Sequence, residues 1–275
     1  SLCDVGIGKG SDMKKRLTVL FACLIVMVGL AACSSNNKSE EPKYADDTAM
    51  ETIAKGYEAR ADLITQLEQS GEDTQSDKNL KKIIKAELDV DSELKDSKFK
   101  DSKMQEDVLS YINSVQAQLD VLKNNSSSNA SFYEEWNDAY DQRSSALKVL
   151  VDSYDLTVSD KYQDDFDELI ANGTAATKKN EQDEGLINNF SNVPWDCADD
   201  GYGSYTYSAV VENTTQFTYS TVNITLGLYD ADGVRQGEAY ANVNSWAPGE
   251  KVRFEAYGTV GAQTVKVEPT YYEAE

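Results

Sequence analysis

Apolar residues recur at spacings of three and four along the first large part of the chain, from Asp46 to about Phe190. This period places them on one face of an α-helix. Stripes of this kind begin at Met50, Leu80 and Tyr162. The clearest one contains Met104, Val108, Ile112, Val115, Leu119 and Leu122. Another contains Phe132, Trp136, Tyr140, Arg143, Leu147, Leu150 and Tyr154. The pattern predicts four or five amphipathic helices packed as an antiparallel bundle.

Local signals suggest where two of these helices begin and where one ends. Thr48 with Glu51, and Ser131 with Glu134, have the spacing of a capping box, in which each side chain binds the other residue's backbone N–H. Gly173 follows the start of the last stripe and is expected to weaken or end that helix.

The pattern changes to alternation after Pro194. Alternating apolar and polar residues are typical of half-buried β-strands. Strands are expected at 205–211, 216–229, 234–243, 252–257 and 264–272, with turns at Asp230–Gly233 and Pro248–Gly249. The sequence therefore predicts an α+β protein of segregated domains, with a helical bundle over 46–190 and a small all-β immunoglobulin-like sandwich over 193–275.

The second domain resembles the FxLYD family, small β-sandwich modules of bacterial surface lipoproteins. The matching segments are Val211–Thr214, Leu228–Gly233 and Ala247–Glu250, together with Phe254. Leu226 stands where the family has phenylalanine, but keeps an apolar side chain at a core-facing position. The resemblance implies no catalytic residues. It implies strand-end and turn roles for Asn213, Tyr229, Asp230, Gly233, Pro248 and Gly249.

The amino-terminal segment looks like an export signal. Lys14, Lys15 and Arg16 precede an apolar run from Leu17 to Leu30. A run of this length is shorter than the roughly 20 residues of a membrane-spanning helix and fits a signal peptide. Translation is expected to begin at Met13, so that residues 1–12 precede the translated start and 13–32 form the signal peptide.

The signal ends in Leu30-Ala31-Ala32-Cys33, which resembles the lipobox of bacterial lipoproteins. The resemblance implies cleavage after Ala32 and a diacylglyceryl group on Cys33. The alternative is a secretory signal that carries a cysteine by chance. Residues 33–45 are polar and are expected to form a flexible tether, which would place the protein outside the cytoplasm and anchored to the cell membrane.

The amino-acid composition limits which catalytic groups the chain can contain and which partners it can bind. The 275-residue chain has no histidine, which excludes Ser-His-Asp and Cys-His nucleophiles. Its formal net charge is −22, and loss of the leader with its four basic and two acidic residues would make it −24. Such a body is expected to avoid nucleic acid and anionic wall polymers. The expected partners are the membrane, through the lipid, and another envelope protein or a cationic or neutral ligand.

A few side chains are candidates for a site. Arg143 lies on an apolar stripe, where it could anchor a ligand; packing beside a structural carboxylate is the favoured alternative. Asp196, Asp199 and Asp200 are weak calcium candidates that fit a turn equally well. Cys197 is expected to be a partly buried free thiol, or to pair between chains. No cofactor is expected.

The favoured function is a non-enzymatic binding or interaction role at the bacterial cell envelope. One alternative is a carboxylate-dependent hydrolase of wall glycan, which needs two acids in one cleft. Another is a solute-binding receptor, although such receptors are usually built from repeated strand–helix units, which this chain lacks.

Overall fold

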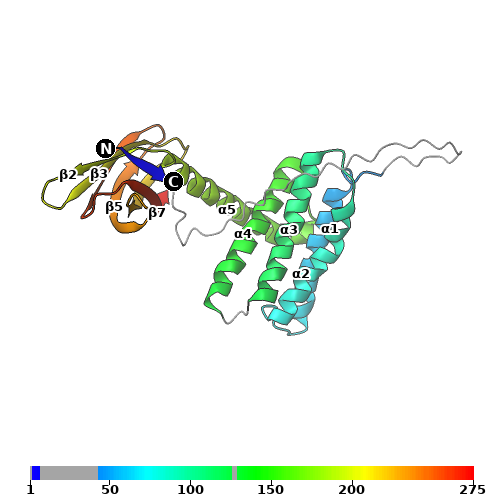
Figure 1. Ribbon diagram of the computed structural model, residues 1–275. Coiled ribbons are helices and arrows are strands. Elements are labelled where there is room, and N and C mark those ends of the chain that lie inside the picture. The colour runs from blue at the N-terminus through cyan, green and yellow to red at the C-terminus, as the bar shows by residue number, and fades with distance from the viewer. Residues whose placement is uncertain (1, 7–42, 126–128) are drawn as a thin grey trace, which may run out of the picture. The chain divides into compact units, whose positions relative to one another are not determined.

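The computed structural model describes residues 2–6, 43–125 and 129–275 (Figure 1). Within this part, the chain divides into two compact units. The helical unit ends at Lys178. The β unit runs from Lys179 to Glu275 and includes the short strand β1 (Leu2–Gly6). The predicted order of helices followed by strands, an α+β arrangement, is confirmed.

Among the residues that the structure describes, five long helices and two short 3₁₀ helices precede the main strands. Their bounds are α1 Ala49–Gln69, α2 Asp77–Asp91, η1 Ser92–Asp96, α3 Ser102–Asn124, α4 Ala130–Tyr154, η2 Asp160–Tyr162 and α5 Gln163–Asn189. The apolar stripes form one buried core in the helical unit, centred on Ile53, Ile84, Val108, Ile112, Val115 and Leu147. Each fully buried aliphatic side chain contributes about 1.5–3 kcal/mol, so the stripes account for the bundle.

The two predicted capping boxes are wrong. The Thr48 hydroxyl donates to the Ala45 carbonyl, and Glu51 pairs with Lys55 one turn further on. Helix α4 begins at Ala130 with Asn129 as its N-cap residue, which places Ser131 inside the helix. Caps form instead at α2 and α3, where the side chains of Ser76 and Asp101 accept backbone N–H bonds.

Gly173 does not end α5, which continues for sixteen residues to Asn189. A Cβ atom at position 173 would lie 2.2 Å from the backbone oxygen of Ser144 on α4. Glycine is therefore required by the close approach of two helices within the helical unit, and its low helix propensity is overcome by packing.

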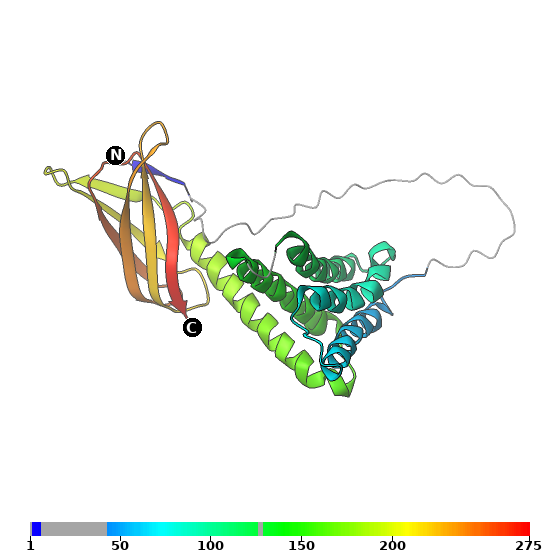
Figure 2. The same cartoon turned by 90° about the horizontal axis from the view of Figure 1, so that it is seen from below.

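The β unit contains two antiparallel sheets. Besides β1, its strands are β2 Trp195–Asp199, β3 Tyr205–Glu212, β4 Tyr219–Tyr229, β5 Arg235–Trp246, β6 Lys251–Gly258 and β7 Thr264–Ala274. One sheet pairs β2, β3 and β6, and the other pairs β5, β4 and β7. Figure 2 shows β7, in red, running beside β4. β1 pairs with both β2 and β7, giving the order β5-β4-β7-β1-β2-β3-β6.

The inner faces of both sheets share one core, whose largest side chains are Trp195, Tyr207, Tyr219, Trp246 and Phe254. Leu186, in the last turn of α5, and Phe190, directly after the helix, are buried in the same core. This packing assigns the last turns of α5 to the β unit, so the boundary falls at Lys178 instead of near residue 190, where the sequence pattern changes.

The five strands expected from alternation are present, and the turns follow the expected residues. Gly233 and Gly249 have φ angles of 76° and 74°, which glycine adopts without strain. β2 was not predicted, because Trp195–Asp199 buries only its first residue and lacks alternation. β1 lies in the segment expected to precede the translated start, and the start at Met13 stays a prediction.

Candidate functional site

The proposed signal cleavage and lipidation positions, Ala32 and Cys33, lie outside the described residues. Within the described ranges, none of the helices has the length and apolar character needed to span a bilayer.

The calcium candidates do not converge. Asp196 and Asp199 are three residues apart on β2, so their side chains leave opposite faces of the strand. The Asp199 carboxylate accepts the backbone N–H of Gly201 at 2.7 Å, a turn role. No group of three acidic, cysteine or histidine side chains suited to a metal occurs among the residues that the structure places. Cys197 is half-buried beside the β-unit core, with a free thiol.

Arg143 is buried in the helical unit and pairs with a carboxylate. Its guanidinium donates to Glu87 Oε1 at 2.8 Å, and Arg60 donates to Glu87 Oε2 at 2.8 Å. The hydroxyl of Tyr111 also donates to Glu87, and Arg60 reaches the Gln118 side-chain oxygen at 3.0 Å. We call these five residues the Glu87 cluster. It brings together side chains from α1, α2, α3 and α4.

The electrostatics of the Glu87 cluster follow from burial and from its two arginines. Burial alone would raise the pKa of Glu87, but the charges of Arg143 and Arg60 outweigh it and hold that pKa at about 2. Asp91, one turn further along α2, has no such partner. Burial, reinforced by repulsion from Glu87, raises the pKa of Asp91 to about 9. Neither Asp91 oxygen accepts a hydrogen bond from the described residues.

The structural alternative for Arg143 is therefore the better supported one, because its charge is matched inside the core. Sequence reasoning missed Glu87 and Asp91. Both acids fall on the apolar stripe of α2, at the spacing of Leu80, Ile83, Ile84 and Leu88. An acid on such a stripe, together with an arginine on another, was the available signal for a buried ion pair.

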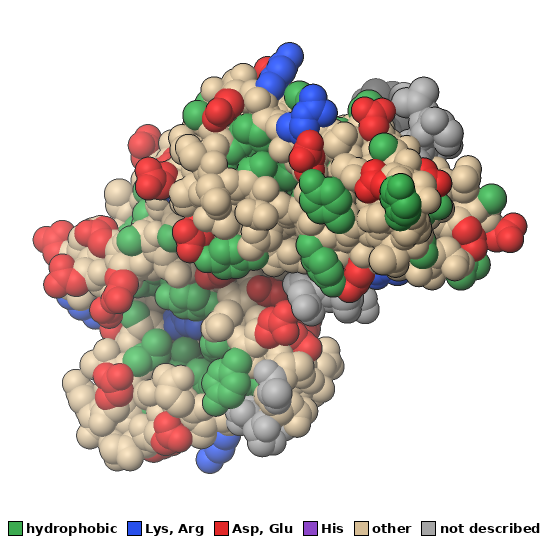
Figure 3. Space-filling view, turned by 90° about the vertical axis from the view of Figure 1, so that its left-hand side faces the viewer, with side chains coloured by type: hydrophobic (Ala, Val, Ile, Leu, Met, Phe, Trp, Pro, Cys, Tyr) green, Lys and Arg blue, Asp and Glu red, His purple; other side chains and the backbone are tan. Residues whose placement is uncertain are grey.

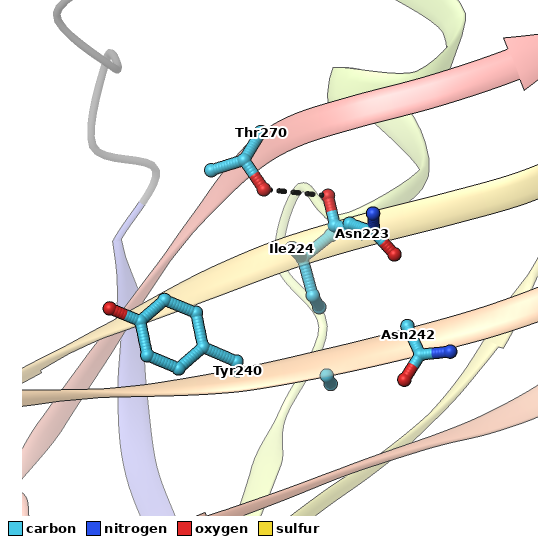
Figure 4. Close-up of a pocket in the computed structure, with 6 residues that line it drawn as sticks. Asn223, Ile224, Tyr240, Asn242 and Thr270 are labelled. Atoms are coloured by element: carbon cyan, nitrogen blue, oxygen red, sulfur yellow. Dashed lines mark hydrogen bonds between the residues drawn. The ribbon is translucent and has the colours of Figure 1, made fainter.

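A second set of polar side chains is open to solvent. A shallow depression of about 310 Å³ lies on the β5-β4-β7 sheet. Figure 4 shows Asn223 on β4, Tyr240 and Asn242 on β5 and Thr270 on β7 around it. We call these four residues the amide face. Ile224 and Ala241 also line the depression, with side chains that belong to the core.

Strand register builds the amide face. Asn223 pairs with Asn242 on one side and with Tyr271 on the other, so all three side chains lie on the same surface of the sheet. The pairing of β4 with β7 shifts after Asn223, as in a β-bulge. The Thr270 hydroxyl donates to the backbone oxygen of Asn223 at 3.2 Å beside this shift, the dashed contact in Figure 4.

The side-chain amides of Asn223 and Asn242 make no hydrogen bond to the part of the protein that the structure describes. This contrasts with Asn213, a buried residue of the same unit. Its amide nitrogen donates to the carbonyls of Phe217 and Trp246, at 2.8 and 3.0 Å, and its oxygen accepts from Thr215. Asn223 and Asn242 therefore keep their side-chain donors and acceptors available, whereas those of Asn213 are bonded within the fold.

A larger depression, of about 450 Å³, lies in the helical unit between α1 and the segment after α4. Three of its charged groups are already engaged: Glu51 pairs with Lys55, and Glu58 accepts the backbone N–H and the hydroxyl of Ser159.

Comparison with known proteins gives no relative: no family model, curated protein or solved structure matches this chain.

Proposed function

We propose that this protein is a bacterial lipoprotein, held on the outer surface of the cell membrane by a lipid on Cys33, and that it binds a partner at the cell envelope without catalysing a reaction. The observation that carries the proposal is the order of the sequence segments at the amino terminus. A basic segment, an apolar run and Leu30-Ala31-Ala32-Cys33 follow one another in the order that lipoprotein processing requires.

The charge of the body limits the partner. Acidic side chains are scattered over the surface in view and basic ones are sparse (Figure 3), as the net charge of −22 requires. An anionic bilayer, nucleic acid or anionic wall polymer is repelled by such a surface within about 8–10 Å at physiological salt. A neutral or cationic ligand, or another envelope protein, is compatible with it.

The β unit provides the binding module in this proposal, as an immunoglobulin-like sandwich related to the FxLYD family. Two sheets around one core, buried Leu226 and Phe254, and glycine turns at Gly233 and Gly249 support this assignment.

The hydrolase alternative has one observation in its favour. Glu87 and Asp91 are neighbouring acids whose pKa values are driven apart, to about 2 and about 9, as in an acid–base pair. Both side chains are fully buried in the helical core, however, and Glu87 is already bonded to Arg60, Arg143 and Tyr111. A glycan would have to open the bundle to reach them, so we favour binding over hydrolysis.

The test is the fate of Cys33. In the bacterial host, Cys33→Ala should abolish acylation and leave the precursor uncleaved or release the protein from the membrane, as measured by mass spectrometry of the amino terminus and by cell fractionation. Cys23→Ala, in the apolar run, is the matched control and should be processed normally. Normal processing and membrane retention of Cys33→Ala would contradict the proposal.

A further inference from the structure

The amide face has the chemistry of a sugar-binding surface. Its groups are two amides, a tyrosine and a threonine hydroxyl, which together donate and accept hydrogen bonds without carrying charge. Tyr240 is 65% exposed, and Tyr271, on the same side of the sheet, is 50% exposed. Both tyrosine hydroxyls bond to a nearby glutamate, Glu238 or Glu273, which restrains the rings.

The charges around the amide face disfavour an anionic ligand. Glu238, Glu268 and Glu273 lie on the same surface of the sheet, as their cross-strand partners show. These acids repel an anion. Of the cations near the face, Arg235 pairs with Glu238 at 2.8 Å, and Lys266 lies 4.4 Å from the centre of the Tyr229 ring. The side chains that line the depression itself are uncharged.

We propose that the amide face binds an uncharged glycan, an inference that rests on the proposed role as an envelope binding protein and names its ligand. Sugar hydroxyls are both donors and acceptors, and match the free amides of Asn223 and Asn242. The C–H face of a sugar ring packs on the exposed ring of Tyr240, because aromatic faces are apolar and carry partial negative charge. The depression is shallow and open, and it therefore suits a chain lying along the sheet better than an enclosed small molecule.

A different ligand would use a different part of the same sheet. β5 lies at one end of the strand order, where an extended peptide could add as a further strand through backbone hydrogen bonds. That mode would not need the side-chain amides of Asn223 and Asn242, so the two modes separate by mutation.

The test is affinity electrophoresis of the full chain in a non-ionic detergent. The net charge drives the protein through a native gel, and an uncharged polymer in the gel retards it only by binding. The probes are galactomannan, hydroxyethylcellulose and dextran, with polygalacturonate as the anionic control. We expect retardation by at least one of the three neutral polymers and none by polygalacturonate.

Asn223→Ala combined with Asn242→Ala should weaken the binding by at least fivefold, the equivalent of one lost hydrogen bond of about 1 kcal/mol. Tyr240→Ala should weaken it as well. Asn188→Ala and Tyr202→Ala are matched controls at exposed positions of the β unit away from the face, and should bind as the wild type does. Fluorescence of Trp195 and Trp246, with Trp136 replaced by Phe, checks that the β unit of each variant is folded.

Three results would overturn the inference: no retardation by any neutral polymer, retardation that survives the double asparagine variant, or equal retardation by the anionic polymer. If any of these results were found while Cys33 is acylated, glycan would be rejected as the ligand, and the proposed lipid-anchored binding protein would stand. If Cys33 were not acylated but the glycan still bound, the proposed lipid anchor would be wrong and the glycan-binding face would stand.

Discussion

The Glu87 cluster and the amide face are both polar, but they differ in what their hydrogen-bonding groups meet. In the cluster, one carboxylate is bonded to two arginines and a tyrosine inside the helical core. On the amide face, two asparagine side chains point to solvent with no protein partner among the described residues. The Glu87 cluster stabilises the fold, whereas the free amides of the amide face can form hydrogen bonds with a ligand. Burial and bonding, more than residue type, separate structural from functional polar residues here.

The largest effect is expected from Glu87→Gln. The substitution leaves the guanidinium groups of Arg60 and Arg143 buried without a counter-charge. Breaking a buried pair in this way costs about 3–5 kcal/mol. Urea unfolding of the helical unit, followed by circular dichroism at 222 nm, measures the loss. Glu51→Gln, which removes an exposed pair with Lys55, should leave the midpoint unchanged. Equal midpoints for the two variants would mean that the cluster is not a structural element.

Asp91 should make the helical unit less stable as the pH rises. Its pKa is about 9 in the folded protein, above the ordinary 3.8 of the unfolded chain. The unfolded state therefore releases this proton first, and stability falls between about pH 4 and pH 9, by at most about 1.4 kcal/mol per pH unit. Glu87, with its lowered pKa, acts in the opposite direction, and only below about pH 4.5.

Asp91→Asn should remove this slope, because asparagine does not ionise. Urea midpoints at pH 5, 6.5 and 8 should show the variant gaining on the wild type as the pH rises. Asp89→Asn, at an exposed position of the same helix, is the control and should follow the wild type. Parallel pH curves for wild type and Asp91→Asn would contradict a protonated, buried Asp91.

Asn213→Ala sharpens the comparison within the β unit. It leaves the buried carbonyls of Phe217 and Trp246 without their donor, and should cost about 1–3 kcal/mol. Fluorescence of Trp195 and Trp246, in a Trp136→Phe background, reports this unit during urea unfolding. A loss no larger than that of an exposed asparagine would show that bonding by Asn213 is not needed for the fold.

The smallest effect on stability is expected from Asn242→Ala. Its side chain is exposed and makes no bond to the described protein, so the free energy of unfolding should change by no more than about 0.5 kcal/mol. The same fluorescence measurement applies. A loss comparable to that of Asn213→Ala would mean that the amide face is part of the fold and is not free to bind.

The sequence predicted the elements better than it predicted their contacts. The stripe from Met104 to Leu122 became α3, and alternation at 205–211 became β3, because each pattern follows from burial of one face. Gly173 was misjudged because helix propensity is local, whereas its role depends on the backbone of Ser144, 29 residues away. The capping box predicted at Thr48 was wrong for a similar reason, because the Thr48 hydroxyl donates to the carbonyl of Ala45 in the preceding turn.

The sites show the same limit. Arg143 could be singled out from its stripe, but its partner Glu87 lies 56 residues away on another helix. The amide face could not be found from the sequence, because it depends on the register that sets Asn223 opposite both Asn242 and Tyr271. A shift of one residue would turn these side chains into the core.

Hydroxyl-radical footprinting with a bound neutral polysaccharide tests most directly whether the amide face is where this protein binds. Tyr240 and Tyr271 lie on the proposed surface, while Tyr202 and Tyr257, 96% and 67% exposed, lie elsewhere in the β unit and serve as internal controls. We expect the polysaccharide to protect Tyr240 and Tyr271 from oxidation and to leave the oxidation of Tyr202 and Tyr257 unchanged. Unchanged oxidation of Tyr240, or equal protection of all four tyrosines, would contradict it.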